Sequence, residues 1–174
     1  MSPSRTLSIC LSISIATMLS GPAFGELTAT FADPAWNGDK VPEGQQCQKF
    51  GGTGGSPALE LAGVPGNANA IVLEFSDRSY QPMDNGGHGK LGFEIEPGEG
   101  KVSVPSAPAH TTDLPAGFFT VEEHQAPNWD KAGTYLPPCS GGRGNEYYVT
   151  IKAVHREGDE HHLLAETKLE MGKY

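Results

Sequence analysis

Basic residues are scarce in this sequence, and it has no long apolar run. The 174 residues include 12 Lys and Arg against 21 Asp and Glu, which gives a formal net charge of -9 at pH 7. Such an acidic chain repels the phosphates of nucleic acids and of anionic bilayers, so the composition disfavours general binding to either one. No apolar stretch reaches the roughly 20 residues that a membrane-spanning helix needs. We therefore expect no transmembrane segment and no nucleic-acid partner.

Glycine and proline, by contrast, are abundant, with 23 and 14 residues in the chain. Both residue types penalise the interior of a helix, so long helices are disfavoured and many short elements joined by turns are favoured. The length of the chain predicts a single domain that is large enough to bury a hydrophobic core of its own.

The first 25 residues have the pattern of a secretory signal peptide. Arg5 precedes an uncharged apolar run over residues 7–19, and Ala23 and Gly25 supply small residues at the -3 and -1 positions of a cleavage site. We therefore predict a signal peptide over residues 1–25 and export of the protein.

Two other interpretations of this segment are disfavoured. A membrane anchor would have to cross roughly 30 Å of hydrocarbon, which an apolar run of about 13 residues cannot do. A lipoprotein would need a cysteine at the cleavage point, whereas Cys10 lies inside the apolar run. The expected mature protein is residues 26–174, located in the periplasm or secreted.

Export also changes the interpretation of the cysteines. Without Cys10, the mature chain keeps Cys47 and Cys139, an even pair in an oxidising compartment. A disulfide between them would close a loop of about 92 residues and stabilise the fold by about 4–5 kcal/mol. The alternative is two free thiols, and because an exposed thiol is a liability in an exported protein, we expect the bridge. The Cys-x-x-Cys spacing of zinc sites is absent.

The periodicity of apolar residues predicts short strands. Residues 68–75 include four consecutive apolar residues after a Pro-Gly turn, which is typical of a central strand that is buried on both faces. Other segments alternate between apolar and polar residues or are rich in β-branched and aromatic ones. These further strands are expected at residues 91–95, 102–104, 118–121 and 147–154.

A last strand is expected near the end of the chain. Leu163, Ala165, Thr167, Leu169 and Met171 would share one face, because the charged residues between them would face the other way. The four residues from position 157 to 160 then form a hairpin turn. With no internal repeat and no linker, the sequence predicts one all-β domain with few short helices.

Three segments stand out as candidates for a binding site. His88 lies in a glycine-rich segment, where backbone can approach it closely and a ligand has room. Asp77 ends the predicted central strand, a common position for a pocket residue. The segment 135–145 combines two prolines with Cys139 and has four glycines in or next to it, and its N–H groups together with Arg143 could form a concave anion site.

Each of these residues has a simpler interpretation. His88 could be a turn residue bonded to backbone, and Asp77 could be a cap at the end of a strand. Arg143 in a glycine-rich loop could be an ordinary solvated side chain. From the residues alone, these simpler roles are favoured over a functional site.

Several short motifs follow one another in a specific order. They are Phe31-Ala32-Asp33, Cys47, Ser56-Pro57-Ala58-Leu59, Gly63-Val64-Pro65, Tyr135 to Gly142 and Leu164-Ala165-Glu166. In this order they resemble the phosphatidylethanolamine-binding proteins, in particular the bacterial Raf-kinase-inhibitor-like branch, and the resemblance spans essentially the whole mature chain. It implies a single-domain β-sandwich with a small pocket near one end, which in that family takes phosphate, acetate or phospholipid head groups.

The chain departs from the family pattern at two pocket positions. Ser79 stands where the DPDxP motif has its second Asp, and Asn145 stands where the G-x-H-R-Y motif has its His. His88 matches the His of the HW motif, while Gly89 replaces the aromatic residue. Loss of a His removes a titratable cation and loss of an Asp removes a negative charge, so the two changes oppose each other. The resemblance implies ligand binding by Asp77, His88, Pro138, Ser140, Asn145 and Tyr147, with Ser79 and Arg143 as further candidates.

We expect a non-catalytic binding protein, because no catalytic motif of a hydrolase or nucleotide-binding enzyme is present. No cofactor, metal or catalytic residue is expected, and the protein is expected to be a monomer or a homodimer. A metal-dependent hydrolase remains an alternative, with Asp77, His88, His110 and His124 as conceivable ligands, although these residues lack the spacing of metal ligands.

A second alternative is an inhibitor or modulator of a protease or a host-cell factor. The segment 105–138 carries Trp129 and other aromatic residues and could present them to a protein partner. We expect this segment instead to pack over the edge of the sandwich, because aromatic side chains are readily buried.

Overall fold

The computed structural model describes residues 25–174. Residues 1–24 of the predicted signal peptide, among them Cys10, lie outside the described residues. Eight strands and two single-turn 3-10 helices form the domain. The strands are β1 (Thr28–Phe31), β2 (Leu59–Ala62), β3 (Ala70–Asp77), β4 (Lys90–Glu94), β5 (Lys101–Val104), β6 (Phe118–Glu122), β7 (Glu146–Glu157) and β8 (Glu160–Lys173), and the helices are η1 (Gln48–Phe50) and η2 (Gln81–Met83).

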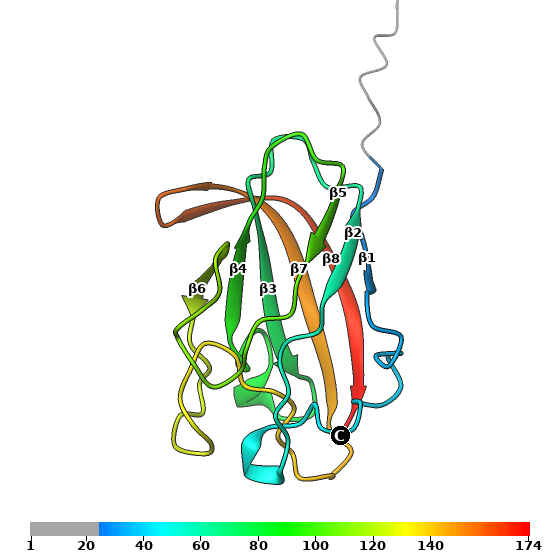
Figure 1. Cartoon of the computed structure of the whole chain (residues 1–174), viewed down its shortest axis with the longest axis vertical. Coiled ribbons are helices and arrows are strands. Elements are labelled where there is room, and N and C mark those ends of the chain that lie inside the picture. Colours follow the sequence, from blue (N-terminus) through cyan, green and yellow to red (C-terminus); the bar gives the residue numbers. More distant parts are fainter. Residues whose placement is uncertain (1–24) are drawn as a thin grey trace, which may run out of the picture.

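The strands form two antiparallel sheets, which confirms the all-β prediction. One sheet has the order β1-β2-β5 and the other has the order β6-β4-β3-β7-β8. Figure 1 shows the smaller sheet lying against the larger one, with the long loops gathered at the lower end of the molecule. Buried side chains of both sheets, among them Leu59, Val104, Ile71 and Val149, belong to one hydrophobic core.

The strand β3 is central and buried on both faces, as its sequence predicts. It pairs with β4 on one side and with β7 on the other. Ile71 and Leu73 face the main core, and Val72 faces a smaller apolar cluster that includes Phe119 of β6. The Phe119 ring covers Gly92, because a Cβ atom at position 92 would overlap that ring. Because Gly92 has no side chain, the Phe119 ring can pack directly on the backbone of β4 at the outer face of the sheet.

The last two strands form the expected hairpin. Glu157 pairs with Glu160 across the turn, and the pairing continues to Lys173. One detail of the prediction is wrong, because Leu163 is 57% exposed and does not share the inward face of Ala165. A register shift in the pairing of β7 with β8, between Ala153 and Val154, interrupts the alternation at this point.

The strands β1 and β2 were not apparent from the sequence. Each has only four residues, and the segment between them is rich in turn residues. Their pairing brings the start of the domain into the sandwich, where Trp36 is 5% exposed and stacks on Phe31 with ring centroids 5.7 Å apart.

A disulfide between Cys47 and Cys139 ties two of the lower loops together, as expected. The two Cα atoms are 5.3 Å apart, and 92 residues separate the cysteines in the sequence. The segment 105–138 contributes β6 to the edge of the larger sheet and otherwise forms loops. Within residues 25–174, no helix is long and apolar enough to cross a membrane.

Candidate functional site

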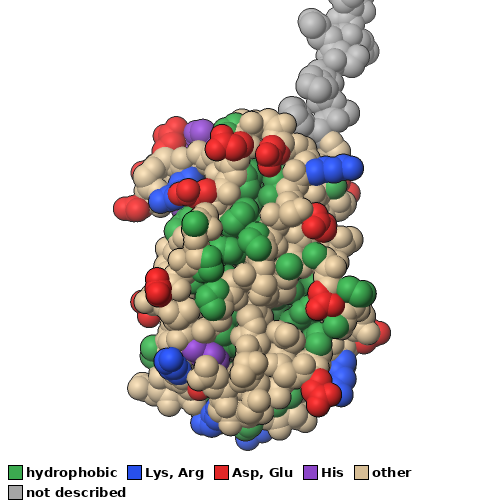
Figure 2. Space-filling model, in the orientation of Figure 1, with side chains coloured by type: hydrophobic (Ala, Val, Ile, Leu, Met, Phe, Trp, Pro, Cys, Tyr) green, Lys and Arg blue, Asp and Glu red, His purple; other side chains and the backbone are tan. Residues whose placement is uncertain are grey.

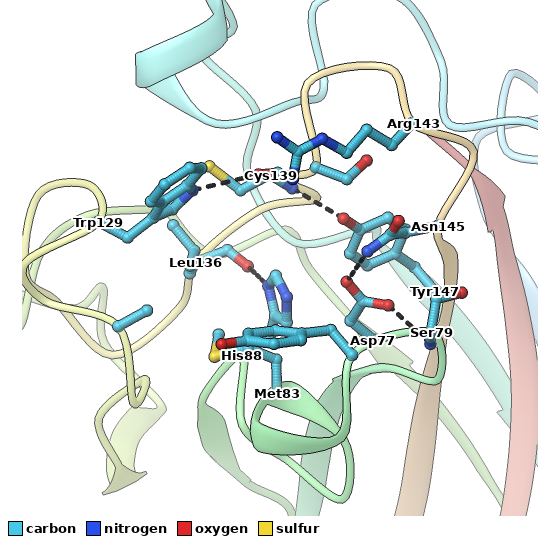
Figure 3. A pocket seen from close by; sticks show the side chains of 13 residues that line it. Asp77, Ser79, Met83, His88, Trp129, Leu136, Cys139, Arg143, Asn145 and Tyr147 are labelled. Carbon is cyan, nitrogen blue, oxygen red and sulfur yellow. Dashed lines mark hydrogen bonds between the residues drawn. The ribbon is translucent and has the colours of Figure 1, made fainter.

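The three segments that stand out in the sequence meet at one pocket at the lower end of the sandwich. The pocket has a volume of about 470 Å³ and is drawn in Figure 3. Asp77 comes from the end of β3, His88 from the loop before β4, and Arg143 and Asn145 from the loop before β7. Ser79, Ser140 and Tyr147 also line it. Of the residues that the resemblance implies, only Pro138 is absent from the lining.

Asp77 is held in place by two hydrogen bonds. The Ser79 N–H donates to Oδ1 at 2.9 Å, and the Asn145 side chain donates from Nδ2 to Oδ2 at 2.6 Å. Asp77 is only 3% exposed, so a buried carboxylate needs these donors to offset its desolvation. Both donors come from segments that flank the pocket, and they orient the carboxylate there (Figure 3).

His88 is buried and bound to the opposite wall through one ring nitrogen. Its Nδ1 lies 2.8 Å from the carbonyl oxygen of Leu136, and because a carbonyl only accepts, Nδ1 carries the proton and donates it. Burial lowers the pKa of His88 to about 4, despite the opposing effects of the Leu136 hydrogen bond and of the Asp77 charge. The ring is therefore neutral at pH 7, and its Nε2 is a hydrogen-bond acceptor.

Among the described residues, the Nε2 atom of His88 is not hydrogen-bonded, and it is not one of the buried atoms that lack a partner, so it is open to the pocket. The ring lies edge-on to Tyr147, with centroids 5.3 Å apart and an interplanar angle of 89°. Because His88 belongs to the lining of the pocket, this free acceptor is available to a molecule bound there.

The backbone geometry at position 89 explains why a glycine stands there in place of the aromatic residue of the HW motif. Gly89 has a φ of +105°, which side chains rarely tolerate, and a Cβ atom would overlap the Thr134 carbonyl oxygen. The strand end around His88 can thus approach the 134–136 segment closely, and the Leu136 N–H donates to the His88 carbonyl at 2.9 Å. An aromatic side chain at position 89 would hold these two walls apart.

The disulfide fixes the upper wall of the pocket. The Cys139 N–H donates to the Tyr147 hydroxyl at 3.1 Å, and the Cys139 carbonyl accepts from Nε1 of Trp129 at 3.2 Å. Pro138 lies behind this wall, where its carbonyl accepts from the Cys47 N–H at 3.1 Å. Burial, with a contribution from the Asp77 charge, raises the pKa of Tyr147 to about 12, so its hydroxyl stays protonated.

Arg143 and two serines complete the polar side. Arg143 is exposed, but it belongs to the pocket lining, and Figure 3 shows its side chain extending across the rim. Ser79 accepts a hydrogen bond from the Glu146 N–H at 3.0 Å, which leaves its own proton free to donate. Ser140 donates to the carbonyl oxygen of Tyr174.

Neither a protein-family model nor a curated protein matches the sequence. Among solved structures, a phosphatidylethanolamine-binding protein homologue from Chlamydia trachomatis is 22% identical, with a TM-score of 0.55 over 86% of this chain and 97% of its own. Escherichia coli YbcL, described as a new member of the mammalian family of these proteins, is 17% identical, with a TM-score of 0.50 over 85% of this chain and 99% of its own. The chain has the phosphatidylethanolamine-binding protein fold. The resemblance carried by the sequence motifs is thereby confirmed for the architecture.

The pocket of this phosphatidylethanolamine-binding protein fold also has an apolar side that the motifs did not indicate. The lining also includes Tyr80, Met83, Ala126, Trp129 and Leu136, and Figure 3 shows Trp129 and Leu136 on the side away from Asn145 and Ser79. Trp129 is 43% exposed, and the ammonium group of Lys49 lies 3.5 Å from its ring centroid. Apolar residues in loops carry no spacing pattern, so the sequence offered no signal for this wall beyond the presence of Trp129.

His110 and His124 lie outside the pocket lining, and each uses both ring nitrogens in hydrogen bonds. Both rings donate to the Lys131 carbonyl, at 3.3 and 3.1 Å, and they accept from the N–H groups of Gln48 and Ala126. The imidazoles therefore organise the loops behind the pocket. The four conceivable ligands of a hydrolase are not brought together.

One further cluster has the composition of a metal site. Among residues 25–174, ligand atoms of Cys47, Asp130 and Cys139 lie within 4.8 Å of one another. The two sulfur atoms are joined in the disulfide, and a disulfide sulfur is not the thiolate that a metal ion requires. This cluster is therefore structural.

Proposed function

We propose that the protein is an exported, non-catalytic binding protein of the phosphatidylethanolamine-binding family, and that its pocket holds a small anion or a phospholipid head group. The main support is the Nε2 of His88, which is not hydrogen-bonded to another described residue and is open to a pocket that has the Arg143 guanidinium at its rim. The His88 residue is 3% exposed and lines the pocket, so its free acceptor is presented to a molecule bound there.

The charge distribution also supports an anionic ligand. The protein as a whole is acidic, but Figure 2 shows that basic side chains gather at the lower end of the face shown, where the pocket loops lie. Arg143 supplies a permanent positive charge with several N–H donors, and Ser79 and the second amide hydrogen of Asn145 supply neutral donors. Together they can coordinate the oxygens of one phosphate or carboxylate group.

The proposed location is the periplasm or the extracellular medium. The disulfide between two distant loops is typical of an oxidising compartment, and the pattern of the first 25 residues is that of a signal peptide. Both observations support export, and neither depends on the identity of the ligand.

Calorimetric titration of the purified protein with inorganic phosphate and with glycerophosphoethanolamine tests the proposal. We expect at least one of them to bind, with Arg143→Gln weakening the affinity about threefold to tenfold because a charge-assisted hydrogen bond is lost. Lys101→Gln is the matched control, since it removes an exposed positive charge at the other end of the sandwich. Absence of binding by both probes, or an equal effect of the two variants, would contradict the proposal.

Exposed aromatic side chains support a second candidate function. Tyr80 and Trp129 are 55% and 43% exposed at the pocket, and aromatic residues are enriched in protein interfaces. In this alternative the protein inhibits a protease or a host-cell factor through the same end of the sandwich. Inhibition in a panel of serine and cysteine proteases that is lost in Tyr80→Ser would favour it.

A further inference from the structure

The floor of the pocket presents hydrogen-bond acceptors. His88 donates its only ring proton to Leu136, so Nε2 offers a lone pair. The Asp77 carboxylate, whose charge acts on His88, presents acceptor oxygens. Figure 3 shows both side chains reaching the same part of the pocket from neighbouring elements. A ligand in contact with this floor must therefore bring a hydrogen of its own.

Ordinary oxyanions differ in this respect. Sulfate and a phosphate diester carry only acceptor oxygens near neutral pH, and an oxygen of either one would face the lone pairs of His88 and Asp77. A phosphate monoester has a second pKa near 6, so near that pH much of it retains one P–O–H group that can donate. Sites built around a buried acceptor reject ligands that lack the matching donor, because the acceptor is then left unpaired.

Resting on the binding function proposed above, and choosing its small anion over a phospholipid head group, whose phosphate is a diester, we propose that the pocket selects oxyanions that carry a proton, in particular phosphate monoesters, over sulfate and phosphate diesters. The P–O–H group donates to Nε2 of His88 or to the Asp77 carboxylate. The other oxygens accept hydrogen bonds from Arg143, Ser79 and the free amide hydrogen of Asn145.

The size and the two-sided lining of the pocket favour an ester over inorganic phosphate. A volume of about 470 Å³ lies within the range of pockets that hold organic molecules and is far larger than one tetrahedral ion. Met83, Trp129 and Leu136 form an apolar wall opposite the polar residues, which suits the carbon group of an ester. The oxyanion would then occupy one side of the pocket and its organic substituent the other.

A fully deprotonated oxyanion could bind only if His88 took up a proton. Because burial lowers the pKa of His88 to about 4, its protonation at pH 7 would reduce the apparent affinity by about 10³, one factor of ten for each pH unit. At neutral pH that penalty falls on sulfate and diesters, whereas a monoester with a second pKa near 6 loses only about tenfold in apparent affinity by keeping its proton.

Calorimetric titrations at pH 6 with methyl phosphate, dimethyl phosphate, sulfate and glycerophosphoethanolamine test the inference. We expect methyl phosphate to bind at least tenfold more tightly than dimethyl phosphate and sulfate. Equal binding of methyl and dimethyl phosphate overturns the selectivity and leaves the proposed function intact. Tighter binding of glycerophosphoethanolamine than of methyl phosphate also overturns it, because the floor then receives an ammonium group. If no probe binds, the proposed function itself fails.

The role of His88 is tested separately with His88→Asn. Asparagine can still donate an amide hydrogen toward the Leu136 carbonyl, but it has no atom in the place of Nε2, so the ratio of the methyl and dimethyl phosphate affinities should fall toward one. An unchanged ratio overturns the assignment. If the variant does not fold, ¹⁵N chemical shifts of His88 in the unaltered protein decide: an unprotonated Nε2 supports the inference and a protonated Nε2 contradicts it.

Discussion

Asn145 donates a hydrogen bond of 2.6 Å from Nδ2 to Oδ2 of Asp77. This bond joins the loop before β7 to the end of β3, two segments that are 68 residues apart in the sequence. At the position where the resemblance places a His, the chain therefore has a neutral amide that orients a buried carboxylate. The carboxylate is satisfied, and no titratable cation is added to the pocket.

We predict that Asn145→Ala lowers the free energy of unfolding by about 1–3 kcal/mol, because it leaves one oxygen of the buried Asp77 carboxylate without its donor. Urea denaturation at pH 7 measures the change. Asn67→Ala, an exposed substitution of the same kind far from the pocket, is the control and should change stability by less than about 0.5 kcal/mol. An equal effect of the two substitutions would contradict the role given to Asn145.

The stability of the protein should fall as the pH decreases from 6.5 to 4. Burial lowers the pKa of His88 to about 4 in the folded state, from an ordinary value of 6.5, and burial also lowers the pKa of His124. Below pH 6.5 the unfolded chain therefore binds protons that the folded chain does not. For His88 alone, the free energy of unfolding falls by about 3 kcal/mol as the pH decreases from 6.5 to 4. Above pH 6.5 this contribution is fully present.

Denaturation curves at pH 7 and pH 4.5 measure this dependence. In His88→Asn the loss of stability between the two pH values should be smaller, because one buried titratable group has been removed. His162→Asn, which changes an exposed histidine, should keep the dependence of the unaltered protein. Identical pH dependence of stability in all three proteins would show that the burial of neutral His88 does not cause the loss of stability at low pH.

Reduction of the disulfide should both destabilise the protein and weaken ligand binding. The bridge between Cys47 and Cys139 closes a loop of 92 residues, for which the chain-entropy relation gives about 4–5 kcal/mol. It also holds Cys139, which bonds to Tyr147 and to Trp129 at the pocket wall. Denaturation and phosphate titration of the Cys47→Ser/Cys139→Ser double variant check both effects. If the double variant folds and binds phosphate with unchanged affinity, the disulfide is not needed to hold the pocket wall in place.

Gly89→Ala should be far more damaging than Gly98→Ala. Both glycines have positive φ values, +105° and +97°, so the two substitutions share the backbone penalty of about 1 kcal/mol. Only at position 89 would the added Cβ overlap the Thr134 carbonyl, which forces the walls around His88 apart. Melting temperatures measure the difference. Equal losses would mean that the close approach is not required.

The intact mass of the protein recovered from a periplasmic extract should correspond to a chain that begins at Glu26 and has no free thiol. Cleavage after Gly25 removes Cys10, and the two remaining cysteines are joined. Mass spectrometry before and after alkylation without reduction measures both features. Recovery of the full 174 residues from the cytoplasm would contradict the signal-peptide prediction.

Strong local patterns made most of the larger sheet predictable. The apolar run of β3 and the alternation in β4 and β8 reflect burial that each strand determines largely by itself. The short strands β1 and β2 depend on partners that are distant in the chain, so four residues of sequence carry too little information. The outward position of Leu163 follows from a register shift, which alternation alone does not reveal.

The candidate site was predictable in its polar residues and not in its hydrogen bonding. The order of the motifs placed Asp77, His88 and Asn145 together, and the structure brings them to one pocket. The acceptor character of His88 depends on the Leu136 carbonyl, which is 48 residues away and reaches the ring only through the fold. The apolar wall with Trp129 likewise arises from loop packing, for which no sequence pattern exists.

The position of the disulfide also bears on when the proposed ligand could bind. One wall of the pocket is built on a covalent bond that forms only under oxidising conditions, because the cytoplasm keeps thiols reduced. In a newly synthesised chain inside the cell, this wall of the pocket would therefore not yet be fixed by the disulfide. Such a chain would bind the phosphate esters of the cytoplasm less tightly. Maturation outside the cytoplasm would restrict the protein to ligands of its surroundings.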